Sequence, residues 1–178
     1  GVCLGSLEIF GGGFIESGTM ANRYVFPIFN WKDELIGISG RYLLDLEKGS
    51  KIPKWKHYGD KSKWNYPLFI NSKIIRNKKE VILVESIGDF LSIRENSNLQ
   101  CLVTFGLDVS PSLINSLISI NPRQIFLSLN NDTDSKENRG LNSSIKNYLK
   151  LLSFFDPDKI KICLPVKNDF GDMDKEDY

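Results

Sequence analysis

The sequence has 178 residues, of which 41% are hydrophobic and 25% charged, and its net charge is +1. This composition is typical of a soluble globular protein, and it excludes a general basic field, so any affinity for nucleic acid has to come from local clusters of cations. Three isolated cysteines and a single histidine exclude the usual spacings of a zinc site, and unpaired thiols suit the cytoplasm. No apolar run reaches the ~20 residues that span a bilayer, so no membrane association is expected. The chain begins without methionine, and we expect it to be part of a longer protein.

Residues 1–78 are predicted to form a smaller mixed α+β subdomain. Within them, residues 23–44 (RYVFPIFNWKDELIGISGRYLL) contain two extended apolar runs around the polar break NWKDE. This pattern predicts a β-hairpin or meander. Gly37 and Gly40 mark bends in it, or places where another part of the chain approaches the backbone closely.

The segment 47–66 mixes cations and aromatic rings and shows no apolar period, so we predict a loop-rich structure. Its members are Lys48, Lys51, Lys54, Lys56, Lys61 and Lys63, interleaved with Trp55, Tyr58, Trp64 and Tyr66. Lysines neutralise phosphates, and aromatic faces stack on unpaired bases of any sequence. In the alternative reading, the rings fill a small core under a long loop and the lysines are merely solvated.

Residues 79–178 show a different pattern, in which strand-like and helix-like segments alternate, and this pattern predicts an α/β fold. The sequence predicts strands at 81–85, 101–105, 124–129 and 160–165, and helices at 87–96, 110–120 and 139–155. Strands that are apolar on both faces and alternate with helices form a parallel sheet that helices cover. We therefore expect a compact unit of about four parallel strands.

Acidic and amide side chains follow three of these strands. They are Glu85 and, one helical turn later, Asp89; Asn130, Asn131, Asp132 and Asp134; and Asp169, Asp172 and Asp174. Ligands of open parallel sheets bind beyond the carboxyl ends of the strands. Clustered acids raise one another's pKa, and a divalent cation relieves the repulsion. Oxygen ligands without histidine or cysteine suit Mg²⁺ or Mn²⁺. In the alternative reading, these acids are solvated loop residues or helix caps.

The ESIGD stretch and the acidic motif after a later strand resemble the TOPRIM domain, which topoisomerases, some nucleases, recombination mediators and DnaG-like primases share. That family usually has Asp-x-Asp as its second acidic motif, whereas this sequence has Asn130 and Asp132 there. An amide oxygen binds a metal more weakly than a carboxylate. Alternatively, Asp132 and Asp134 are the pair, with the register shifted by two residues. Gly140 resembles the glycine that precedes the family's next helix.

The first half resembles the part of DnaG-like primases that precedes their TOPRIM unit. The matching positions are Arg23, Phe26, Pro27, Ile28, Gly37, Gly40 and Arg41, followed by Pro53, Lys54 and Trp55. The exit CLPVKNDFGDM is similar to the end of the primase unit. The resemblance covers roughly residues 23–174 and is that of a diverged phage or plasmid member.

The resemblance implies the catalytic core of a DNA primase, which builds short RNA primers on single-stranded DNA by two-metal nucleotidyl transfer with Mg²⁺ or Mn²⁺. The implied catalytic residues are Glu85, Asp132 and Asp172. Metal binding is expected at Glu85, Asp89, Asn130, Asp132, Asp134, Asp169 and Asp172. Nucleic-acid or nucleotide contacts are expected at Arg41, Lys54, Trp55, Lys56 and Lys63.

The implied partners are a single-stranded DNA template, ribonucleoside triphosphates, and a replicative helicase or zinc-binding module outside this chain. The expected location is the cytoplasm of a bacterium or a phage-infected cell. Two alternatives stay open: a TOPRIM nuclease that uses the same metals, and a non-catalytic module that binds single-stranded nucleic acid.

Overall fold

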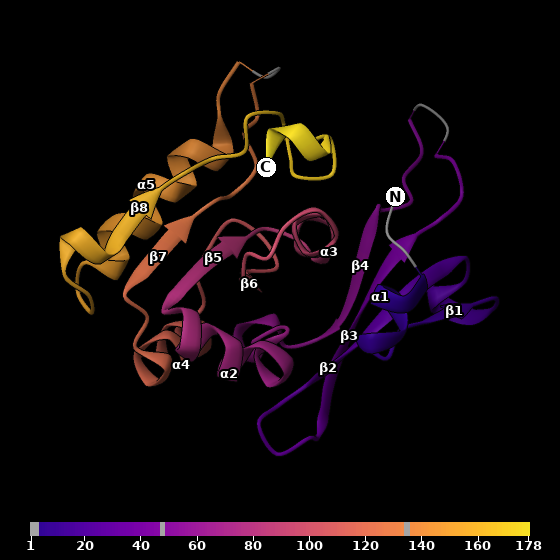
Figure 1. Ribbon diagram of the computed structural model, residues 1–178. Coiled ribbons are helices and arrows are strands. Elements are labelled where there is room, and N and C mark those ends of the chain that lie inside the picture. Colours follow the sequence, from indigo (N-terminus) through magenta and orange to yellow (C-terminus); the bar gives the residue numbers. More distant parts are fainter. Residues whose placement is uncertain (1–3, 47–48, 134–135) are drawn as a thin grey trace.

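The computed structural model describes residues 4–46, 49–133 and 136–178, and it contains two four-stranded sheets side by side (Figure 1). The parallel sheet has the order β6-β5-β7-β8. Its strands are β5 (Glu80–Val84), β6 (Cys101–Val103), β7 (Gln124–Leu127) and β8 (Ile160–Ile162). The predicted α/β class and the parallel sheet are confirmed, although each strand ends one to three residues before the end of its predicted range.

Helices cover both faces of this sheet. They are α2 (Leu68–Lys78), α3 (Ile87–Asn96), α4 (Pro111–Ile120) and α5 (Arg139–Leu151), while α1 (Leu4–Ile9) belongs to the first half. Helices α2, α4 and α5 pack with Val81 and Leu83 on one face. Helix α3 packs with Val84 and Val103 on the other, because successive residues of a strand point to opposite faces.

The starts of two helices follow from local sequence. Ser110 precedes α4, accepts a hydrogen bond from the Leu113 N–H, and is followed by Pro111 at the first helical position. Asn138 caps α5 by accepting a bond from the Leu141 N–H. The helices therefore begin where a side-chain oxygen can satisfy the free N–H groups of the first turn.

The antiparallel sheet forms the predicted subdomain, in the order β1-β2-β3-β4. Its strands are β1 (Gly13–Ile15), β2 (Arg23–Phe29), β3 (Leu35–Tyr42) and β4 (Trp55–Gly59). The hairpin of β2 and β3 is confirmed. Gly37 is a place of close approach, because a Cβ there would lie 2.2 Å from the Trp64 ring. At Gly40 a Cβ would lie 2.6 Å from Met20.

The prediction of a loop-rich segment at 47–66 is wrong for its middle part. Strand β4 pairs with β3, and Lys61–Lys63 form a short 3₁₀ turn. Trp55 and His57 face one side of this edge strand, while Lys56 and Tyr58 face the other. Side chains therefore alternate between the two faces as in any strand. Because the positions on one face are Trp and His and not aliphatic residues, a search for alternating apolar residues does not detect this strand.

The two sheets share one hydrophobic cluster. Phe26 and Trp64 from the first half pack in it with Val84, Phe90 and Phe105 from the second. Helix α3 accordingly lies between the sheets in Figure 1. The division at residues 78 and 79 stays a prediction. Within the described residues, no helix combines the length and apolar character that a membrane crossing requires.

Candidate active site

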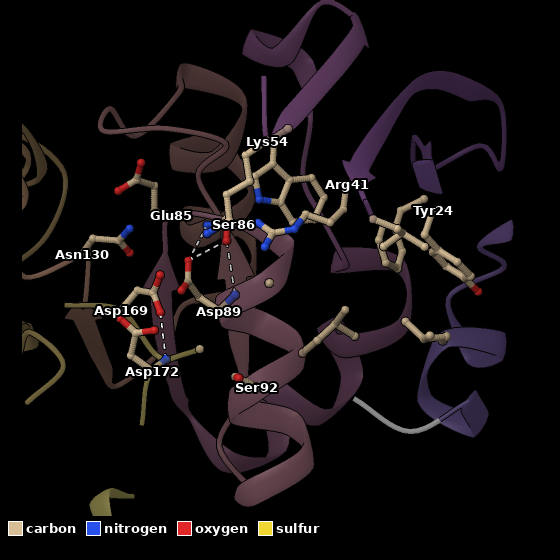
Figure 2. Close-up of a pocket in the computed structure, with 17 residues that line it drawn as sticks. Tyr24, Arg41, Lys54, Glu85, Ser86, Asp89, Ser92, Asn130, Asp169 and Asp172 are labelled. Carbon is tan, nitrogen blue, oxygen red and sulfur yellow. Dashed lines mark hydrogen bonds between the residues drawn. The ribbon is translucent and has the colours of Figure 1, made fainter. Parts of the chain in front are cut away.

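A pocket of about 540 Å³ lies where the carboxyl ends of the parallel strands face the antiparallel sheet. Figure 2 shows its polar side chains in order: acids and an amide on one side, Arg41 in the middle, and Tyr24 opposite. The oxygen-bearing side is formed by Glu85, Asp89, Asn130, Asp169 and Asp172. The other side includes Arg41, Lys54 and Trp55. Most of the predicted site residues therefore line a single pocket.

Asp89 reaches the pocket from the first turn of α3 and is only 3% exposed. Its Oδ2 accepts bonds from the Ser86 N–H (2.9 Å) and hydroxyl (2.7 Å), and Ser86 Oγ accepts from the Asp89 N–H (3.2 Å). This reciprocal pair is a capping box. Burial raises the pKa of Asp89 to about 6, and the charge of Asp169 acts in the same direction. Asp89 thus serves as a helix cap as well as lining the pocket.

Glu85 follows the last residue of β5 and is half-buried. Burial raises the pKa of its carboxyl group, and the charges of Asp89 and Asp132 raise it further. The Arg139 charge and a hydrogen bond from the Asn130 main chain oppose this shift. A cation placed beside Glu85 would stabilise the ionised carboxylate and so offset this rise in pKa.

Asn130 comes from the chain that leaves β7. Its Oδ1 atom is buried and has no hydrogen-bond partner among the described residues. Its backbone lies against α5 so closely that a Cβ at Gly140 would be 1.5 Å from the Asn130 carbonyl oxygen. This close contact explains why position 140 holds a glycine. The Asn130 Oδ1 atom is left as an unsatisfied buried acceptor at the pocket wall.

Asn131 ties this loop to the chain after β8. Its N–H donates to the Asn168 carbonyl (2.7 Å), and its amide donates to the Pro165 carbonyl (2.9 Å). Its side-chain oxygen accepts a bond from Asn138 (2.7 Å). The acids of the third and fourth strand ends are held together through these bonds.

Asp132 lies beside the pocket and not in its described lining, and its Oδ2 is 3.5 Å from Arg139 Nε. It remains near enough to raise the pKa of Glu85. Asp172 lines the pocket, and its N–H donates to Asp169 Oδ1 at 3.0 Å. Asp134 lies outside the described residues. Asp174 pairs with Lys167 at 2.8 Å and does not line the pocket.

Within the part of the chain that the structure describes, no three Asp, Glu, His or Cys side chains converge closely enough to hold a metal ion. Glu85, Asp89, Asp169 and Asp172 share the pocket, but Asp89 is bonded to Ser86, and Asp132, beside the pocket, pairs with Arg139. The donors nevertheless suit a hard cation, since all are oxygens and the Asn130 oxygen has no competing donor.

The basic side of the pocket is built on strand register. Arg41 pairs with Trp55 across β3 and β4, and its guanidinium lies 5.7 Å from the centre of the indole ring. Burial lowers the pKa of Arg41, while the charges of Asp169 and Asp89 oppose this. Lys54 is exposed at the entry of β4. Two cations thus face the acids across the pocket.

No protein-family model matches the sequence, and no curated protein matches it. Solved structures do. A DNA primase domain from Pseudomonas aeruginosa superimposes with a TM-score of 0.69 at 17% identity, over 94% of this chain and 52% of that one. The E. coli primase catalytic core gives 0.66 at 17% identity, over 94% and 54%. A DnaG primase catalytic domain bound to ssDNA gives 0.68 at 16% identity, over 96% and 59%.

The chain has the fold of the DnaG primase catalytic core. It spans about half of the length of the primase structures that it matches. The expected TOPRIM-type fold of a DnaG-like primase is therefore confirmed, and the activity and partners of the whole protein are proposals.

This primase-core fold does not bring every predicted contact residue to the pocket. Lys56 lies on the other face of β4, where its ammonium donates to the Thr19 carbonyl at 2.7 Å. Lys63 pairs with Asp60 at 3.4 Å on the 3₁₀ turn. Trp64 and Tyr66 are 1% and 5% exposed, so they belong to the core and cannot stack on bases. For these two rings, the alternative prediction that they fill a core is correct.

Three residues that shape the pocket were given no site role by the sequence. Ser86 caps α3, and the Ser-x-x-Asp spacing could have revealed it. Arg23 is 3% exposed and donates to the carbonyls of Pro53 (2.7 Å) and Lys54 (3.3 Å), which holds the entry of β4 in place. Tyr24 enters the pocket through β-sheet register, which no local pattern reveals.

Proposed function

We propose that this chain is the RNA polymerase core of a DNA primase, which joins ribonucleotides into short primers on single-stranded DNA. One observation carries the proposal: oxygen ligands from three strand ends and the cations Arg41 and Lys54 line opposite sides of one pocket. Nucleotidyl transfer needs this combination, since metals hold the reacting phosphate and cations hold the rest of the triphosphate.

The metal ions of the proposed reaction are Mg²⁺ or Mn²⁺, bound as a pair. Glu85, Asn130, Asp169 and Asp172 would hold them, with Asp132 from the same rim and Asp89 as an additional acidic group. When bound, the metals neutralise the phosphates and lower the pKa of the attacking hydroxyl. The unsatisfied Asn130 oxygen and the raised pKa of Glu85 support this assignment. Of these residues, Glu85, Asp132 and Asp172 are proposed to be catalytic.

The side chains of this protein have separate tasks in the proposal. Arg41 and Lys54 bind phosphate oxygens of the nucleotide or the template, and Trp55 stacks on an unpaired base. The carboxylates would hold the metals in place. Because protons compete with metal for Glu85, metal affinity should fall as the pH falls.

The proposed partners are a single-stranded DNA template, ribonucleoside triphosphates, and a helicase or zinc-binding module outside this chain. Two matching structures support nucleic-acid binding: the DnaG domain described as bound to ssDNA, and a Mycobacterium tuberculosis primase domain in complex with double-stranded DNA. The proposed setting is the cytoplasm of a bacterium or a phage-infected cell.

The substitution Glu85→Gln tests the proposal. It keeps the size of the side chain and removes its charge, so primer synthesis from labelled ribonucleotides, Mg²⁺ and a single-stranded template should fall at least about a hundredfold. Mn²⁺ binding, followed by titration calorimetry, should weaken in parallel. Glu80→Gln is the matched control, because Glu80 begins the same strand at its opposite end and is exposed.

The same assay separates the alternatives. Labelled oligoribonucleotides support the primase, whereas shortened DNA would identify a TOPRIM nuclease. Template binding that ignores Mg²⁺ and is unchanged in Glu85→Gln would identify a non-catalytic binding module. Equal priming by wild type and Glu85→Gln would refute the proposed role of the pocket.

A further inference from the structure

The pocket continues past Arg41 to Tyr24, a ring to which the proposed reaction gives no task. Phe26, Trp55, Leu43 and Leu91 also line the pocket. The Tyr24 and Phe26 rings are 5.2 Å apart at 56°, and the Phe26 and Trp55 rings are 6.3 Å apart at 41°. The three rings thus form a row that runs from Trp55, near Gly88, to Tyr24, which lies on the side of the pocket away from the acids.

Strand register sets the order of side chains along this row. Tyr24 on β2 pairs with Arg41 on β3, and Arg41 pairs with Trp55 on β4. Paired residues of neighbouring strands point to the same face, and such strands lie about 4.8 Å apart. Arg41 therefore stands between two aromatic side chains, as Figure 2 shows for Arg41 and Tyr24.

The Tyr24 ring is held in place and remains accessible. On one side it packs against the main chain at Gly12, where a Cβ would lie 2.3 Å from Tyr24 Cε1. The side chain is half-exposed, whereas Phe26 below it is 2% exposed. Phe26 therefore supports the ring, and Tyr24 offers its free surface to the pocket.

We propose that Tyr24 forms the platform on which the base of the incoming nucleoside triphosphate stacks. This inference rests on the proposed function and deepens it. The order of groups in the pocket is carboxylates, then Arg41, then the Tyr24 ring. The order of groups in a metal-bound nucleotide is metal, triphosphate, sugar and base, so the two match end to end. The volume of about 540 Å³ is in the range of small-molecule sites.

The test compares the binding of ATP with that of ribose 5-triphosphate, which lacks only the base, in the presence of Mg²⁺. The wild type should bind ATP roughly tenfold more tightly, as expected for one base on one aromatic ring. Tyr24→Ala should reduce this preference to about twofold or less and leave the affinity for ribose 5-triphosphate unchanged, which also shows that the variant is folded. Tyr24→Phe should keep the preference.

Trp31→Ala is the control, because Trp31 is 83% exposed on the β2–β3 turn and does not line the pocket. A wild type without preference for ATP, or a preference that survives Tyr24→Ala, overturns the inference. The inference is also overturned if Tyr24→Ala binds oligodeoxythymidylate more weakly than the wild type but keeps its preference for ATP over ribose 5-triphosphate. The ring would then bind the DNA template and not the nucleotide. The test measures binding and not catalysis. A preference for ATP without any primer synthesis would therefore refute the polymerase proposal but not the role of Tyr24.

Discussion

At the scale of single residues, His57 shows how a core position sets the charge of a side chain. It lies half-buried on β4, between the rings of Trp64 (5.9 Å) and Phe105 (6.0 Å), and its buried Nδ1 has no hydrogen-bond partner among the described residues. Burial lowers the pKa of His57 to about 4, with smaller contributions from Lys61 and Arg23. The imidazole is therefore neutral at neutral pH.

This pKa predicts a dependence of stability on pH. The unfolded chain binds a proton near pH 6.5 and the folded chain only near pH 4, so the free energy of unfolding should fall as the pH falls through this window. Relative to His57→Gln, which does not titrate, the wild type should lose roughly 1–2 kcal/mol between pH 7.5 and 4.5, a value reduced for the partial exposure of the ring.

Urea unfolding of both proteins at the two pH values measures this difference. His57 is the single histidine of the sequence, so its proton resonances report its titration without ambiguity. A midpoint near 6.5, or equal pH dependence in wild type and His57→Gln, would contradict the prediction.

At the scale of elements, the position of α5 depends on one glycine. Gly140 in its first turn has no side chain, and the helix therefore lies directly on the Asn130 backbone at the end of β7. The same contact positions the pocket amide, so the packing of a helix on a strand end and the shape of the site are coupled.

Gly140→Ala tests this coupling. Although alanine favours helix by about 1 kcal/mol, its Cβ would overlap the Asn130 carbonyl, and we expect the free energy of unfolding to fall by roughly 1–3 kcal/mol. Mn²⁺ binding should weaken as well, because Asn130 is displaced. Gly13→Ala is the control, since a Cβ at Gly13 meets nothing within 4 Å. Equal stability and metal affinity in Gly140→Ala and wild type would show that the helix can shift without consequence.

At the scale of the whole molecule, the two sheets are joined by their shared hydrophobic cluster. Trp64 and Phe26 fill it from one side and Phe90 and Phe105 from the other. Tyr66 also forms an antiparallel bridge to Val103 of β6. Neither half can bury its face of this cluster without the other, so the two halves should unfold together.

Leu117→Ala provides the test, because Leu117 is fully buried in α4, in the cluster on the far face of the parallel sheet. The change should cost about 2–5 kcal/mol. All three tryptophans lie in the first half, at positions 31, 55 and 64, so their fluorescence reports on that half. If unfolding is cooperative, the fluorescence midpoint in urea should shift as much as the far-ultraviolet circular dichroism midpoint. A shift of the dichroism alone would mean that the halves unfold independently.

Some features of this protein depend only on nearby residues, and the sequence by itself determined them. Helix α3 at 87–96 and the start of α4 at Pro111 follow from caps and apolar periods within a few positions. The alternation of apolar strands with helices likewise leads to the parallel sheet. Because parallel strands share one carboxyl edge, Glu85, Asn130 and Asp172 could be assigned to one rim.

Only the tertiary structure decided the rest, because those features are contacts between distant segments. The edge strand β4 and the burial of Trp64 depend on partners that no local pattern specifies. The same holds for Tyr24, which reaches the pocket through its register with Arg41. A side chain in a strand can lie on either face of the sheet. Its register with the neighbouring strand, which the fold sets, decides whether it lies on the face that borders the pocket.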